Sequence, residues 1–99
     1  MDSLYFDHEF EAPIVEHDVG SARYRYTVVF VPAELSTALP LERFPRLRIS
    51  GEVNDHPIEA SLTPVRGQWY VLLSKSTLKA IDARLGDLVT LRFRIADQD

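Results

Sequence analysis

The chain has 99 residues, a formal net charge of −4 at pH 7 and no cysteine. This length suits one domain, placed over residues 1–99, with one hydrophobic core and no covalent staples. The lack of cysteine excludes disulfides, thiolate catalysis and cysteine-based zinc sites. The first ten residues lack the basic and apolar segments of a signal peptide, and apolar runs such as 28–31 are too short to span a bilayer. We therefore expect a cytoplasmic domain without membrane contact.

Charge is distributed unevenly along the chain. Residues 1–18 hold six acidic residues and no lysine or arginine, and Asp97 and Asp99 add two acids at the other end. Residues 19–96 carry eleven basic and seven acidic residues, and nine of the basic residues are arginine. This excess is weak beside the strongly basic surfaces of nucleic-acid-binding proteins.

The first half of the chain predicts two strands and a short helix. Apolar residues alternate with polar ones over 4–14, which is the period of a half-exposed strand, and Pro13 places that strand at an edge or a bend. A second strand is expected over 24–30. A helix over about 32–39 follows, because Pro32 suits the first helical position. The inward residues expected of the second strand are Tyr24, Tyr26, Val28 and Phe30.

The second half predicts four more strands and a second helix. The strands cover about 46–53, 58–62, 69–73 and 87–95, and the first two of them pair in an antiparallel hairpin. Ser74 or Ser76 can cap the helix. Gly86 is expected to end this helix in the left-handed conformation. The residues expected in the buried stripe of the helix are Leu78, Ile81 and Leu85.

The two halves match each other at one fixed offset, the shift that carries Val29 onto Val71. The matched pairs are Val29/Val71, Ala38/Ala80, Leu39/Ile81, Leu47/Val89 and Ile49/Leu91. Two of the five pairs are identities, so the similarity lies in the pattern, and a chance match is the alternative. A duplicated strand–helix–strand unit would close a barrel with a pseudo-two-fold axis. The predicted fold is therefore mostly β, with about six strands and two short helices.

Two short segments resemble the ends of the motif found in AbrB-like swapped-hairpin barrels. They are residues 31–35, Val-Pro-Ala-Glu-Leu, and residues 85–89, Leu-Gly-Asp-Leu-Val. AbrB-like proteins build their barrel as dimers, so this resemblance implies a single-chain version of such a barrel.

A longer stretch, from about Phe6 to Asp97, is similar to a bacterial family of unknown function that is sometimes fused to an OmpD-associated, bacteriocin-protection domain. The segments that carry the similarity are Phe-Val-Pro at 30–32, Ile-Ser-Gly-Glu-Val at 49–53, Ile-Glu-Ala-Ser-Leu at 58–62 and Gly-Asp-Leu-Val at 86–89. The resemblance implies a small double-split β-barrel. It implies no activity.

Residues that could support catalysis or metal binding have simpler structural roles. Asp87 fits a turn acceptor, because no partner acid or histidine lies at a useful spacing. Residues 74–76, Ser-Lys-Ser, fit a helix cap with a solvated lysine. His8, His17 and His56 come from different elements and lack the spacing of metal ligands. We expect no enzyme activity, no metal site and no cofactor.

Three Arg-x-Arg pairs on predicted strands form the main candidate site. Both members of a pair point to the same side of their strand, so neighbouring strands would gather up to six arginines on one surface. That surface would bind phosphate, nucleic acid or an acidic peptide. The alternative is cross-strand pairing with glutamates at 9, 11, 52 and 59. The six residues are Arg23, Arg25, Arg46, Arg48, Arg92 and Arg94.

These observations favour a non-enzymatic interaction or ligand-binding module that is a monomer or a weak homodimer. Its partner is expected to be a protein or an anionic ligand. The alternative is a nucleic-acid-binding regulator, which rests on the AbrB-like analogy of fold and is disfavoured by the acidic net charge. Tyr5 and Tyr70, which lie on the faces opposite the apolar residues of their strands, could line a pocket or an interface.

Overall fold

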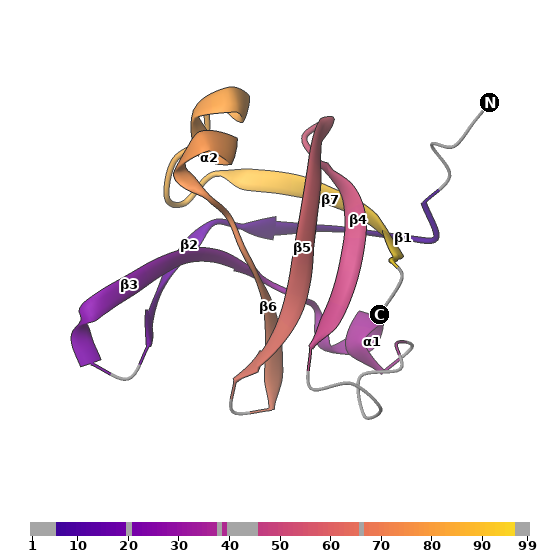
Figure 1. Cartoon of the computed structure of the whole chain (residues 1–99), viewed down its shortest axis with the longest axis horizontal. Helices are drawn as coiled ribbons and strands as arrows, with labels where there is room; N and C mark the ends of the chain where they lie inside the picture. The colour runs from indigo at the N-terminus through magenta and orange to yellow at the C-terminus, as the bar shows by residue number, and fades with distance from the viewer. Residues whose placement is uncertain (1–5, 20, 38, 40–45, 66, 97–99) are drawn as a thin grey trace.

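A computed structural model describes residues 6–19, 21–37, 39, 46–65 and 67–96, with the backbone alone at 18, 19 and 21–24. The strands in this part of the chain are β1 His8–Pro13, β2 Val15–Val19, β3 Ser21–Phe30, β4 Leu47–Val53, β5 His56–Val65, β6 Gln68–Leu72 and β7 Leu88–Ile95. The helices are α1 Ala33–Ser36 and α2 Lys75–Ile81. All strand pairs are antiparallel, and they form one sheet in the order β1-β7-β4-β5-β6-β3-β2 (Figure 1).

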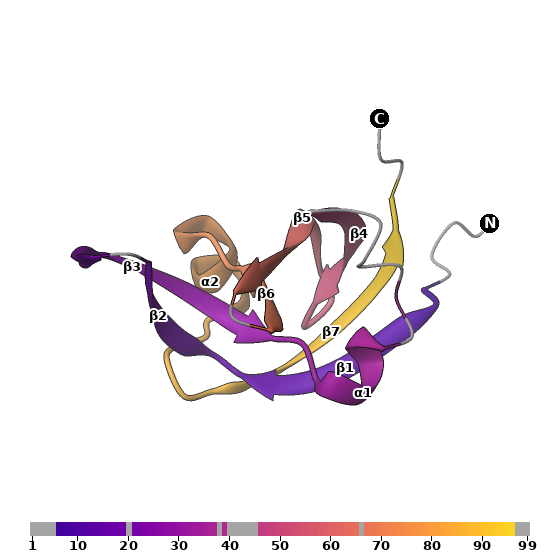
Figure 2. The same cartoon turned by 90° about the horizontal axis from the view of Figure 1, so that it is seen from below.

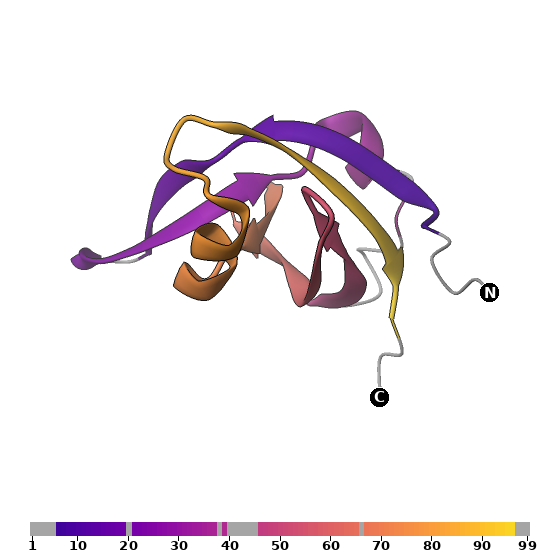
Figure 3. The same cartoon turned by 90° about the horizontal axis from the view of Figure 1, so that it is seen from above.

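The sheet curls because its two outermost strands are successive parts of one chain segment. Ile14 separates β1 from β2, and these strands stand at opposite ends of the strand order. The Ile14 N–H donates to the Asp87 carbonyl at 2.9 Å, and the Gly86 N–H donates to the Ile14 carbonyl at 2.8 Å. Figure 2 and Figure 3 show β1 running beside β7 along the curled sheet. The mostly-β, barrel-like fold class is therefore confirmed.

The predicted count of six strands is wrong, because β2 was not expected. Its sequence includes Glu16, His17 and Asp18 and lacks the alternating apolar pattern of a half-buried strand. Pairing with β3 through the chain reversal near residue 20 makes it a strand. Pro13 ends β1, which agrees with the bend predicted there. β5 also extends to Val65, three residues beyond the end of the strand predicted over 58–62.

The hydrophobic core lies on the inner face of the curl. As predicted, alternate residues of β4 and β7 supply much of it. Leu47, Ile49, Val89 and Leu91 are each at most 2% exposed and belong to one buried cluster. Phe93 is fully buried and packs edge-on against Phe10 of β1. The two helices lie near opposite ends of the curled sheet (Figure 1 and Figure 2).

The predicted orientation of β3 is wrong. Val29 and Val31 enter the core, whereas Tyr26 is 39% exposed on the opposite face. Val28 is buried as well, but outside the core cluster. The strand carries apolar residues on both faces from position 28 onward, so its pattern did not settle which face points inward. The side chain of Tyr24 lies outside the described residues.

Both helices are shorter than predicted. α1 covers four residues of the expected 32–39, and α2 ends at Ile81, where Asp82 takes the left-handed conformation with φ 55°. Leu85 is consequently 53% exposed rather than part of a buried stripe. Gly86 has the predicted positive φ, 92°, but in the turn that follows the helix. The predicted cap is present, since the Thr77 N–H donates to the Ser74 Oγ at 3.1 Å.

Gly51 marks the closest approach of β4 and β7. It pairs with Phe93, and a Cβ at this position would collide with the Arg92 carbonyl oxygen and lie 2.8 Å from the Phe93 Cα. Both obstacles are backbone atoms of the neighbouring strand. An added methyl group would therefore push the two strands apart.

We expect Gly51→Ala to lower the free energy of unfolding by about 2–3 kcal/mol, near the upper end of the usual cost of overpacking. The cost is high because the atoms in the way belong to the backbone of β7, which cannot move aside as the end of a flexible side chain can. Urea denaturation followed by circular dichroism measures the loss. Gly67→Ala is the control, because Gly67 has φ +81° and no atom within 4 Å of its added Cβ. Its cost comes from strain alone, about 1 kcal/mol. Equal losses in the two variants would contradict a tight strand contact at Gly51.

Candidate anion-binding groove

The structure divides the six candidate arginines instead of gathering them on one surface. Arg48 on β4 and Arg92 and Arg94 on β7 alternate with buried residues and point to the outer face of the sheet. Arg46, exposed, directly precedes β4 on the same face. Arg25 lies on the other face of β3, because that strand presents Val29 rather than Val28 to the core.

Arg92 contacts a glutamate named in the alternative of cross-strand pairing, and Arg25 contacts another acidic side chain. Arg92 Nη2 lies 2.6 Å from Glu52 Oε1, the residue opposite it on β4, and 3.0 Å from Asp55 Oδ1. Its guanidinium also stands 5.5 Å from the centroid of the Phe6 ring. Arg25 Nη1 lies 3.6 Å from Glu16 Oε1. The side chain of Arg23 lies outside the described residues.

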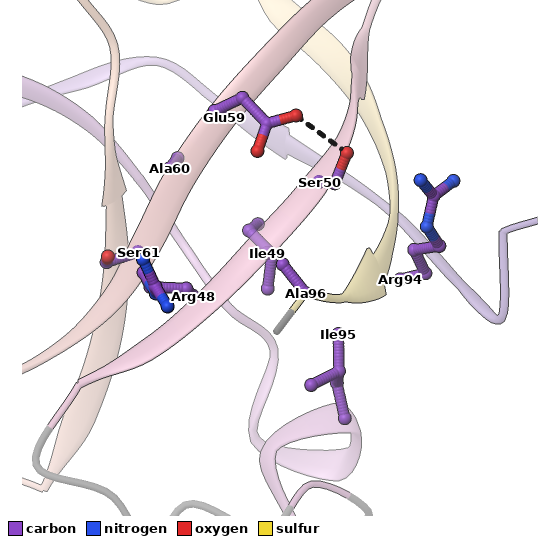
Figure 4. Close-up of a pocket in the computed structure, with 9 residues that line it drawn as sticks. All are labelled: Arg48, Ile49, Ser50, Glu59, Ala60, Ser61, Arg94, Ile95 and Ala96. Carbon is purple, nitrogen blue, oxygen red and sulfur yellow. Dashed lines mark hydrogen bonds between the residues drawn. The ribbon is translucent and has the colours of Figure 1, made fainter. Parts of the chain in front are cut away.

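The other three arginines line two adjoining cavities on the outer face of β4 and β5. The first cavity, about 600 Å³, has Arg48 and Arg94 among its lining residues. Figure 4 shows Arg48 beside Ser61 on one side of this cavity and Arg94 on the other side. Between them, the Ser50 Oγ donates a 2.8 Å hydrogen bond to Glu59 Oε2.

The second cavity, about 410 Å³, extends from β5 toward β6 and the start of α2. Arg46 lines it, together with hydroxyl groups and a set of apolar and aromatic side chains. It shares Glu59, Ala60 and Ser61 with the first cavity. We call the two cavities together the β5 groove. The apolar and aromatic residues of the second cavity are Tyr26, Ile58, Ala60, Tyr70, Leu72 and Leu73.

An aromatic cluster supports the apolar end of the β5 groove. The ring of His17 lies 5.3 Å from that of Tyr70 and 5.8 Å from that of Phe30, and the Phe30 and Tyr70 rings are 6.2 Å apart, centroid to centroid. Tyr70 is 9% exposed, so it forms a fixed wall. The sequence indicated the outward position of Tyr70. It did not indicate that His17 and Phe30 lie beside Tyr70, because His17 belongs to β2, a strand that was not predicted. Tyr5 lies outside the described residues.

The described part of the groove presents groups that can bind anions. Guanidinium groups and hydroxyls line it, and among the described residues no three of the His, Asp and Glu type gather to hold a metal. Asp87 Oδ2 accepts the Arg84 N–H at 2.9 Å, the turn role expected of it. His8 stacks on Phe93 with ring centroids 5.1 Å apart. No helix in the described ranges has the length and apolar character needed to cross a membrane.

Comparison with known proteins identifies a family and no activity. A family model described as "Domain of unknown function (DUF1905)" matches residues 10–93, which include all of β2 to β6 and most of β1 and β7. No curated protein matches the chain. The family match agrees with the resemblance to a family of unknown function stated from the sequence. The AbrB-like resemblance stays a prediction.

Arg92 and Arg46 are expected to differ in their effect on stability. Arg92→Ala leaves Glu52, whose side chain is 15% exposed, without its ion-pair partner, which costs about 1–2 kcal/mol. Arg46→Ala removes an exposed side chain at the groove and should change the free energy of unfolding by less than about 0.5 kcal/mol. Chemical denaturation of both variants measures the difference. A loss in Arg46→Ala as large as in Arg92→Ala would show that Arg46 also supports the fold.

Proposed function

We propose that this chain, which belongs to the DUF1905 family of unknown function, is a non-enzymatic binding module for anionic partners. Its binding surface is the β5 groove. The observation that carries the proposal is the placement of Arg46, Arg48 and Arg94 around two cavities that share part of their lining. Planar guanidinium groups suit carboxylates and phosphates, and the Ser61 hydroxyl, which lines both cavities, can donate a further hydrogen bond. A cytoplasmic location and a monomeric or weakly dimeric state belong to the same proposal.

The arginines favour an extended ligand over a single small ion. Arg48 and Arg94 stand on opposite sides of the first cavity in Figure 4, and Arg46 borders the second cavity. A ligand with several anionic groups can reach all three arginines. A lone phosphate would contact one of them at a time.

A protein partner fits this surface better than nucleic acid does. The net charge of −4 opposes long-range attraction to a polyphosphate chain. Glu59, in the lining shared by the two cavities, repels phosphates and carboxylates alike. A peptide can place a neutral residue beside it, whereas a nucleic acid carries a phosphate at every nucleotide. The nucleic-acid regulator remains the alternative, and the dependence of binding on salt distinguishes it.

The offset between the two halves of the sequence also relates paired strands of the structure. We propose that the chain contains two copies of one unit around a pseudo-two-fold axis. The strand pairs Val29–Val71 and Gly51–Phe93 each join residues that this offset relates, and it also carries the first residue of α1 onto the first residue of α2. A single two-fold rotation that superposes residues 26–36 and 47–53 on 68–78 and 89–95 in a crystal structure would be the expected result. Unrelated orientations of the two segments would contradict the duplication.

The groove arginines have no counterparts under this offset. It carries Arg46 onto Leu88, Arg48 onto Thr90, and Arg94 back onto Glu52. The fold therefore accepts other residues at the equivalent positions of its other half. Arg92, which is paired with Glu52, also lacks an arginine counterpart, because the offset carries it back onto Ser50.

Fluorescence anisotropy with a labelled glutamate-rich peptide and with labelled single-stranded DNA, at about 50 mM salt, tests the proposed function. We expect the peptide to bind, and Arg48→Ala with Arg94→Ala to weaken binding at least about tenfold, since charge-assisted hydrogen bonds are lost. The matched control is Arg25→Ala with Arg84→Ala, which removes the same charge away from the groove. This control should keep most of the affinity.

Three outcomes would contradict the proposal. If the peptide does not bind, the proposal of an anionic partner is wrong. If the control variant loses as much affinity for the peptide as the groove variant, the loss reflects the change in net charge and not the groove. Tighter binding of the DNA, with an affinity that falls steeply as salt rises, would favour the regulator.

A further inference from the structure

We propose that the partner of the β5 groove is an extended acidic peptide segment with an aromatic or large aliphatic side chain next to its carboxylates. This inference rests on the proposed function and names its ligand. It follows from the unlike chemistry of the two cavities, one bordered by arginines and hydroxyls and the other by apolar rings and side chains.

The apolar cavity suits one large side chain. Tyr26 and Leu72 are 39% and 48% exposed, which leaves apolar surface available for a contact. Tyr70 lines the same cavity and is held in place by its ring contacts with His17 and Phe30. An aromatic side chain seated on such a wall gains apolar burial and offset or edge-on ring contacts. A ligand of charge alone would leave this surface exposed to water.

The charged cavity begins where the apolar cavity ends. Both are lined by Glu59, Ala60 and Ser61 of β5, so an occupant of one continues directly into the other. Arg46 borders the apolar cavity, so a carboxylate beside the ligand's large side chain meets it first. Carboxylates further along the ligand then meet Arg48 and Arg94. This order matches acidic residues that flank one apolar residue.

The exposure of the lining favours a peptide over a small molecule. Sites for small molecules bury most of the ligand's surface. Here Arg46, Arg48, Glu59, Leu72 and Ser74 are all exposed. A shallow groove of this kind suits a segment whose remaining atoms belong to a larger partner. Peptide recognition of this type combines a few anchoring side chains with charged contacts around them.

Two labelled peptides of equal charge test the inference. Both are glutamate-rich, and one carries phenylalanine at its centre where the other carries serine. We expect the phenylalanine peptide to bind the wild-type protein at least about tenfold more tightly, because an aromatic side chain buried in a pocket contributes about 1.4 kcal/mol or more, which is a factor of ten in affinity. Isothermal titration calorimetry or anisotropy gives the two affinities.

Variants at the apolar end separate this inference from the proposed function. Tyr26→Ser with Leu72→Ser should abolish the preference for phenylalanine, so that the two peptides bind this variant with equal affinity. Leu88→Ser is the matched control, because Leu88 is 62% exposed outside the groove. It should leave both affinities unchanged. Thermal unfolding of each variant confirms that it is folded, and Leu72→Glu, which adds a repulsive charge, should weaken both peptides.

Three further outcomes would each contradict the inference. Equal binding of the two peptides to the wild-type protein would overturn the inference and leave the proposed function in place. Failure of both peptides to bind would overturn both. Self-association of the chain that Tyr26→Ser with Leu72→Ser abolishes would identify a second copy as the occupant, and it would also overturn the acidic-peptide partner.

Discussion

The fixed position of the Ile14 backbone is the constraint on which the rest of the structure depends. Hydrogen bonds to Asp87 and Gly86 hold this residue against the start of β7, at the point where the chain passes from β1 to β2. The same segment therefore pairs with β7 before Ile14 and with β3 after it. A sheet whose two ends belong to one segment must curl, and the curl produces an enclosed inner face and an open outer face.

The inner and outer faces of the sheet differ in their chemistry. The inner face excludes water with large aliphatic and aromatic residues, and Gly51 lets β4 approach β7 closely enough to complete it. The outer face carries charge, and its arginines have two different roles. Arg92 is engaged with Glu52 and Asp55, whereas Arg46, Arg48 and Arg94 line the β5 groove.

Local patterns predicted the elements that have one apolar face. β4 and β7 alternate strictly, so their inward residues could be named from the sequence, and Ser74 could be named as a cap from its chemistry. The spacing of apolar residues did not predict the orientation of strands in which both faces are apolar or neither face is. β3 offers Val28 to one face and Val29 to the other, and β2 offers acids and a histidine. Such strands take their orientation from their partners.

By itself the sequence determined that the chain forms a mostly-β domain, because the spacing of apolar residues sets which elements can bury a face. It also determined which residues could carry charge chemistry. Tertiary structure alone decided which arginines meet. That choice depends on strand order and register, and a shift of one residue moves a side chain to the opposite face of the sheet. The orientation of β3 removed Arg25 from the candidate surface, and the β4–β7 register paired Arg92 with Glu52 and left the three groove arginines around the cavities of β5.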